Sequence, residues 1–122
     1  MHHSHIAWAA GLLEGEACFD IRKSQSVKRD PNNMHVRVIV EMKDKDVLGR
    51  LQEMFGGTLT EVRCKSKQRE NWSTYYKWLL TKREDVQLCL CVIKPYMSQR
   101  RTERINEILK FLNRKLNEGK SN

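Results

Sequence analysis

The chain has 122 residues, which suffice for a single domain with one modest hydrophobic core. Its 23 lysines and arginines outnumber 15 aspartates and glutamates, and the formal net charge of +8 favours a polyanionic partner, nucleic acid before a membrane surface. No apolar run reaches the length of a membrane span and no signal peptide is visible, so we expect a soluble, intracellular protein whose compartment and host the sequence leaves open.

The cysteine pattern excludes a zinc finger and gives no sign of a disulfide framework. The chain has four cysteines, Cys18, Cys64, Cys89 and Cys91, with no C-x-x-C pair and no finger spacing. We expect reduced thiols that mostly fill the core.

The first predicted element is a short helix that ends at Gly15. At 100° per residue, small residues and one acid share one face: Ala7, Ala10, Gly11, Glu14 and Gly15. Trp8, Ala9, Leu12 and Leu13 form the opposite, core-facing side. Two glycines in a short helix cost roughly 1 kcal/mol each relative to alanine. We therefore expect a second helix to pack closely against the small face, with Glu16 just past the helix end.

Two strands and a helix are expected next. Residues 18–23 and 34–42 alternate between apolar and polar side chains, with Val36, Val38 and Val40 on the buried side, and a polar loop over 24–33 joins them. Asp44 is placed to cap a helix that Gly56-Gly57 ends.

A second strand pair is expected over 58–65 and 73–80. A helix from Thr81 to about Ile93 follows, Pro95 interrupts it, and Ser98 caps a long final helix. The order αββαββαα predicts one α+β domain over residues 1–122, with an antiparallel sheet that helices cover on one face.

Basic residues concentrate on the outward sheet positions and the strand loops, where we expect one surface to hold Arg22, Lys23, Lys28, Arg29, Arg37, Arg63, Lys65, Lys67, Arg69 and Lys77. Polar side chains lie between them: Gln25, Asn32, Asn33, His35, Gln68, Asn71, Ser73 and Tyr75. Lysine and arginine bind phosphates, while amide and guanidinium groups read base edges in the major groove. A solvated sheet face is the alternative, but such faces mix both signs of charge, so we favour contact with double-stranded DNA.

The stretch from Ala9 to Ala17, A-A-G-L-L-E-G-E-A, resembles the LAGLIDADG motif of a homing-endonuclease family. The glycine, the first leucine, the second apolar position and both acidic positions agree in kind, whereas Ala17 replaces the final glycine. Residues 43–57 and 94–97 also resemble the family, and the order of elements is the family's. The resemblance therefore spans nearly the whole chain.

The resemblance implies a homing-endonuclease-like fold with a DNA-binding antiparallel sheet, encoded within an intron. A single motif implies a homodimer through the small helix face, and a pseudo-palindromic target cut once in each strand. The two Glu16 carboxylates are then expected to converge and to hold Mg²⁺ or another divalent cation, together with backbone carbonyls such as that of Ala17. Glu14 is expected to bond across the interface rather than to bind metal.

Other positions depart from the family. A glutamine that often precedes the second helix is Met42 here, with Glu41 or Lys43 as substitutes. The family's catalytic lysine falls near Arg100, a cation that cannot act as a neutral base. A site-specific, metal-dependent DNA endonuclease is the first hypothesis. A catalytically inactive DNA-binding regulator or intron-RNA maturase is the second, and a small basic RNA-binding protein is the third.

Overall fold

A computed structural model describes residues 2–23, 34–65 and 72–120 of the chain. Its elements are α1 (His3–Glu16), β1 (Cys18–Lys23), β2 (Met34–Met42), α2 (Lys45–Phe55), β3 (Thr58–Lys65), β4 (Trp72–Leu80), α3 (Arg83–Ile93), the 3-10 turn η1 (Lys94–Tyr96) and α4 (Gln99–Lys120). The predicted αββαββαα order is confirmed.

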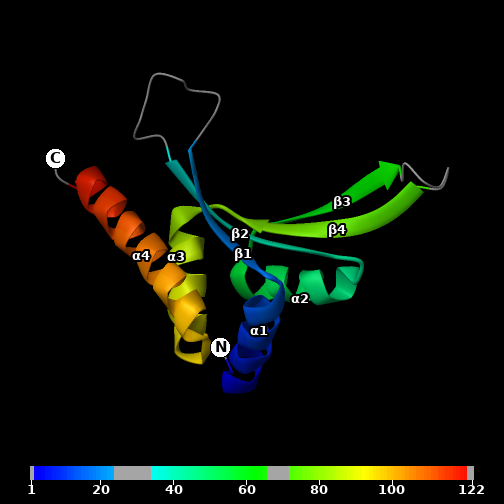
Figure 1. Ribbon diagram of the computed structural model, residues 1–122, viewed down its shortest axis with the longest axis horizontal. Helices are drawn as coiled ribbons and strands as arrows, with labels where there is room; N and C mark the ends of the chain where they lie inside the picture. Colours follow the sequence, from blue (N-terminus) through cyan, green and yellow to red (C-terminus); the bar gives the residue numbers. More distant parts are fainter. Residues whose placement is uncertain (1, 24–33, 66–71, 121–122) are drawn as a thin grey trace.

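The strands form one antiparallel sheet in the order β1-β2-β4-β3. The helices lie together on one side of this sheet, and the β1–β2 and β3–β4 hairpins diverge from its middle (Figure 1). We call the side away from the helices the open face. The α+β arrangement with helices on one face is as predicted.

The core forms where the alternating strand residues meet the helices. Val36, Val38 and Val40 of β2 are buried, as predicted, and β4 adds Trp78 and Leu80. The helices supply the other side of the core: Leu13 from α1, Leu48 and Leu51 from α2, Val86 and Leu90 from α3, and Ile105, Ile108 and Leu112 from α4. Because these side chains are apolar and sit on one face of each element, burying them removes them from water and holds the layers together.

Two glycines end α2, as predicted. Gly56 and Gly57 have φ of 84° and 91°, a backbone conformation that side chains disfavour. A Cβ on Gly57 would lie 2.6 Å from the carbonyl oxygen of Leu79. Trp78 Nε1 donates a hydrogen bond of 2.9 Å to the carbonyl oxygen of Gly56. The tight turn thus brings β3 alongside β4.

Several local predictions are corrected. The first helix includes Glu16 instead of ending at Gly15, because the N–H of Ala17 closes a last helical turn onto the oxygen of Leu13 at 3.1 Å. Asp44 is at the N-cap of α2, but its side chain makes no capping hydrogen bond. The predicted loop over 24–33 lies outside the described residues.

Cysteines fill the core less than expected. Cys89 is buried, and burial raises the pKa of its thiol to about 12. Cys18 and Cys91 are exposed. None of the helices in the described ranges combines the length and hydrophobicity that a membrane span needs.

Candidate active site and nucleic-acid interface

One face of α1 is open. Ala7, Gly11 and Gly15 are exposed and recur every fourth residue. A Cβ added to either glycine would meet no described residue within 4 Å. Ala10 is only 1% exposed and packs into the core, so its predicted place on the contact face is wrong. The helix is rotated so that Ala9, Ala10 and Leu13 face inward. The open stripe therefore consists of Ala7, Gly11 and Gly15.

Glu14 of α1 bonds within its own chain. One carboxylate oxygen accepts a hydrogen bond of 2.5 Å from the backbone N–H of Ser98, and the other lies 3.4 Å from Arg101 Nε. The Ser98 N–H holds the pKa of Glu14 below its usual value, and the charges of Arg101 and Arg100 act in the same direction. Glu14 thus bonds to the start of α4 in its own chain. The sequence instead predicts a bond to a second chain across the dimer interface.

Arg101 joins three elements at this place. Its Nη1 donates a hydrogen bond of 2.7 Å to the carbonyl oxygen of Ala17, the residue between α1 and β1. The guanidinium also lies 5.1 Å from the ring centroid of Phe19. Sequence reasoning misses this role of Arg101, because no local pattern links residues 84 positions apart.

Glu16 is the last residue of α1, and its side chain is exposed. No hydrogen bond or ion pair engages its carboxylate within the described part of the chain. The last carbonyl groups of a helix have no partner inside the helix, and the helix dipole adds partial negative charge there. Glu16 and these backbone oxygens are hard donors of the kind that Mg²⁺ and Ca²⁺ prefer.

The described residues of one chain do not form a metal site by themselves. Among the described residues, no three histidine, cysteine, aspartate or glutamate side chains gather closely enough to hold a metal ion. The Ala17 oxygen already accepts a hydrogen bond from the Arg101 guanidinium, whose positive charge opposes a second cation. The donor chemistry therefore fits a divalent cation at Glu16, while Ala17 as a second ligand stays a prediction.

The family resemblance also points to Arg100 and to the residues around Met42, and the structure gives these positions different surroundings. Arg100 is exposed in the first turn of α4, and its charge reaches Glu14 at the far end of α1. Met42 packs against the core and offers no polar group, while Glu41 and Lys43 are exposed. The catalytic role of Arg100 stays a prediction.

The strand register divides the predicted basic surface. Asp20 pairs with Arg37, Glu41 with Lys77, and Val62 with Tyr75, all on the open face. On β3, by contrast, Leu59 packs against the core, and alternation places Arg63 on the same, helix-covered side. The prediction that Arg63 shares a surface with Arg37 and Lys77 is therefore wrong.

His35 is exposed next to Arg37 in β2, at a position paired with Arg22. The side chains of Arg22, Lys23 and Lys65 lie outside the described part, as do whole residues Gln25, Lys28, Arg29, Asn33, Lys67 and Arg69. DNA contact by these residues stays a prediction.

A profile described as LAGLIDADG endonuclease matches residues 9–114. No curated protein sequence gives a match. Solved structures give the same fold. The homing endonuclease I-CvuI, in complex with an I-CreI target in the presence of Mg, superposes with a TM-score of 0.67 at 17% identity, over 88% of this chain and 65% of that one. This chain thus spans slightly less than two thirds of I-CvuI.

Two further structures are similar. The homing endonuclease I-GzeII in complex with its DNA target has a TM-score of 0.69 at 17% identity, over 100% of this chain and 40% of that one. The archaeal intron-encoded homing endonuclease I-Vdi141I, complexed with DNA, has a TM-score of 0.63 at 15% identity, over 92% of this chain and 69% of that one. At these identities the likeness concerns the fold.

Proposed function

The chain belongs to the LAGLIDADG endonuclease family, and on this premise we propose that it is a homodimeric, site-specific DNA endonuclease. It binds a pseudo-palindromic site in double-stranded DNA and hydrolyses one phosphodiester bond in each strand, with Mg²⁺ or another divalent cation. The observation that carries this proposal is the exposed Glu16 carboxylate, which has no partner among the described residues and ends a helix whose face is open.

The homodimer follows from what one chain lacks. A single Glu16 with backbone oxygens is an incomplete metal site, because duplex hydrolysis needs charge neutralisation at each scissile phosphate. The stripe of Ala7, Gly11 and Gly15 leaves room for the backbone of a second helix. In a two-fold dimer the same face of each copy meets the other, and because Glu16 follows Gly15 directly, the two carboxylates end close to the axis.

The residues around the carboxylate have separate tasks in this proposal. A divalent cation, when bound, activates water and neutralises phosphate charge. Glu16 and the backbone oxygens at the end of α1 would hold it. Arg101 fixes the end of α1 and the start of β1 by its bond to Ala17. Arg100 carries a guanidinium, so it attracts phosphate and cannot act as a neutral base.

The open face supplies the DNA surface. The net charge of +8 favours a polyanion, and the described open face carries Arg37 and Lys77 on its two inner strands. A two-stranded β-ribbon fits the major groove of B-DNA. The β1–β2 and β3–β4 hairpins extend in different directions from the middle of the sheet (Figure 1), so together they suit an extended half-site.

The test uses randomised duplex DNA and the full chain with Mg²⁺. We expect the wild type to enrich a pseudo-palindromic site and to cut both of its strands. Glu16→Gln should bind the same site and cut at least about a thousandfold more slowly, since the lost ligand contributes several kcal/mol of charge stabilisation. Glu53→Gln, which removes an exposed carboxylate from α2, is the matched control and should cut like the wild type.

The alternatives give different results. A wild type that binds one duplex site but cuts neither strand with Mg²⁺ or Mn²⁺ is an inactive DNA-binding regulator, and the endonuclease proposal fails. A wild type that prefers structured RNA to every duplex is a maturase or another RNA-binding protein. Cutting by Glu16→Gln at the wild-type rate removes Glu16 from the chemistry.

A further inference from the structure

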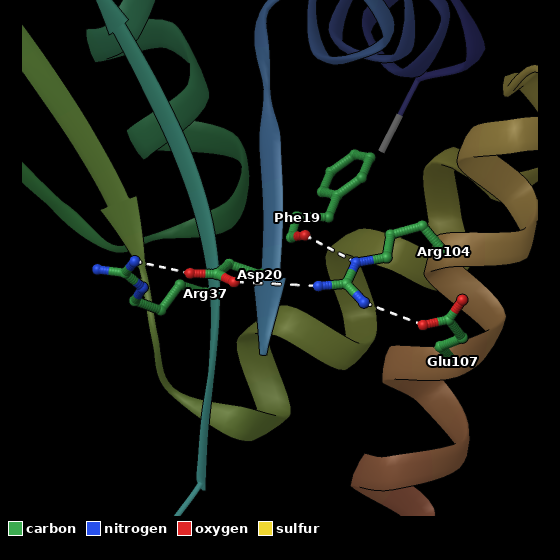
Figure 2. A network of polar contacts seen from close by, with 5 residues as sticks. All are labelled: Phe19, Asp20, Arg37, Arg104 and Glu107. Atoms are coloured by element: carbon green, nitrogen blue, oxygen red, sulfur yellow. Dashed lines mark hydrogen bonds and ion pairs between the residues drawn. The ribbon is translucent and has the colours of Figure 1, made fainter. Parts of the chain in front are cut away.

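A network of charged side chains joins β1, β2 and α4 at the open face (Figure 2). Arg37 Nη2 donates a hydrogen bond of 2.7 Å to one carboxylate oxygen of Asp20. The other oxygen of Asp20 lies 3.9 Å from Arg104 Nη2. Arg104 is itself fixed, because its Nε donates to the carbonyl oxygen of Phe19 at 3.0 Å and its Nη1 to Glu107 at 2.9 Å. Both oxygens of Asp20 therefore face an arginine.

Arg37 is held in one position by this network. Its side chain is only 21% exposed, and its Nε is buried with no hydrogen-bond partner among the described residues. An arginine alone on a surface loses much conformational freedom when it binds a ligand. Here Asp20 has already fixed the plane of the guanidinium, and a preorganised fork loses less on binding.

The outer edge of the same guanidinium still has donors to offer. No described residue accepts a hydrogen bond from Arg37 Nη1, which points away from Asp20 in Figure 2. Nη2 carries a second N–H beyond the one given to Asp20. Two neighbouring donors in one plane match the O6 and N7 acceptors of guanine in the major groove.

The position of Arg37 favours a base edge over a phosphate. It lies on β2, an inner strand of the sheet, and on the open face. A ribbon that enters the major groove turns its face to the base edges, while the phosphates flank the groove. Both Asp20 oxygens face arginines, so the Asp20 carboxylate is oriented toward Arg37 and Arg104.

We propose that Asp20 is a positioning residue that holds Arg37 to read one guanine in each half of the DNA target. The inference rests on the proposed function, because it needs duplex DNA on the open face. In a homodimer each copy presents the same pair, so the two guanines lie at symmetric positions of the site. Arg104 of α4 in turn contacts Asp20 and the backbone of β1 at Phe19, so it helps to hold Asp20 in place.

The experiment selects bound sequences from randomised duplex DNA without divalent cation, so that no cutting intervenes. The wild-type consensus should carry one guanine per half-site that depends on this pair. Arg37→Lys keeps the charge but not the planar fork, and Asp20→Ala frees the fork. Both should reduce the guanine preference at that symmetric position about tenfold, with the other positions unchanged.

Controls separate this reading from a structural role or a phosphate contact. Glu61→Ala removes the same charge as Asp20→Ala from the opposite face of the sheet, and should keep the wild-type consensus. Asp20→Asn preserves the shape of the side chain and serves if Asp20→Ala fails to fold. Arg37→Ala tests the alternative that Arg37 contacts a phosphate. In that case the variant should bind all sequences more weakly, and the slope of log K against log salt concentration should fall in magnitude by about one.

The inference is overturned if the consensus of Arg37→Lys and of folded Asp20 variants retains every wild-type guanine. A uniform loss of affinity with an unchanged consensus also overturns it, in favour of a phosphate contact. In both cases the proposed function stands, because the wild type still selects a duplex site. A wild type that selects no duplex sequence overturns the proposed function and this inference together.

Discussion

Arg101 Nη1 donates a hydrogen bond of 2.7 Å to the carbonyl oxygen of Ala17, although the two residues are 84 positions apart. The same guanidinium lies beside the Glu14 carboxylate, with Nε 3.4 Å from an oxygen. The end of α1, which carries Glu16, is therefore anchored by α4. The Arg101 guanidinium thus occupies the Ala17 carbonyl, which the family resemblance implies as a metal ligand, and it fixes the backbone next to Glu16.

Removal of this anchor should destabilise the fold. Arg101 is 17% exposed, and Arg101→Ala loses a charge-assisted hydrogen bond together with the contact to Phe19. We expect the free energy of unfolding in urea to fall by about 2 kcal/mol. Arg101→Lys should retain only part of this stability, because the lysine ammonium lacks the planar fork of N–H donors of a guanidinium. The exposed neighbour gives the control: Arg100→Ala should change stability by less than about 0.5 kcal/mol. Equal losses at both positions would contradict the anchor.

The contact between Glu14 and Ser98 predicts a pH dependence. The Ser98 N–H lowers the pKa of Glu14 from 4.5, so folding favours the ionised carboxylate. Its contribution is fully present above pH 4.5 and is lost as pH falls through the lowered folded pKa. Urea unfolding of the wild type and Glu14→Gln should therefore differ at pH 7 and converge in acid. Glu53→Gln is the control, because it removes an exposed carboxylate that lacks this contact. A Glu14→Gln difference that stays constant down to pH 3 would sink this account.

The elements that local pattern decides could be predicted from the sequence. Alternation fixed β1 and β2, and the glycine pair fixed the end of α2, because each depends on residues a few positions apart. The rotation of α1 about its axis could not be predicted, because small and apolar residues occur on all sides of this helix. Several of its faces could therefore pack against the core equally well. For this reason the sequence pattern places Ala10 and Glu14 on the contact face, whereas the structure does not.

The candidate site shows the same division. Glu16 came from a contiguous motif, and the structure leaves its carboxylate exposed. Charge alone groups Arg63 with Arg37 and Lys77. In β3, however, Arg63 follows Leu59 by four residues and therefore lies on the same side of the sheet as that core residue. The roles of Arg101 and Asp20 rest on contacts between distant segments. Only the packed tertiary structure brings those side chains together.

The turn after α2 should tolerate one glycine replacement better than the other. Both positions have positive φ, but a Cβ on Gly57 would lie 2.6 Å from the oxygen of Leu79, whereas a Cβ on Gly56 would lie 3.7 Å from its nearest neighbour. We expect Gly57→Ala to lower the free energy of unfolding by about 2–4 kcal/mol and Gly56→Ala by about 1–3 kcal/mol. Thermal unfolding of the two variants in parallel measures the order, and a reversed order would refute the steric argument.

The open stripe on α1 makes the last prediction. A Cβ on Gly11 meets nothing within 4 Å in the described part of its own chain, so Gly11→Leu should fold, as circular dichroism can verify. In a dimer packed through this stripe the leucine overfills the interface, at a cost of about 1–3 kcal/mol, which weakens association roughly tenfold to a hundredfold. Sedimentation velocity measures this shift. Gly49→Leu is the matched control, since Gly49 lies within α2 with equally open space at its Cβ position. A Gly11→Leu protein that dimerises as tightly as Gly49→Leu and the wild type places the partner helix elsewhere, and the two Glu16 carboxylates then do not meet through this face.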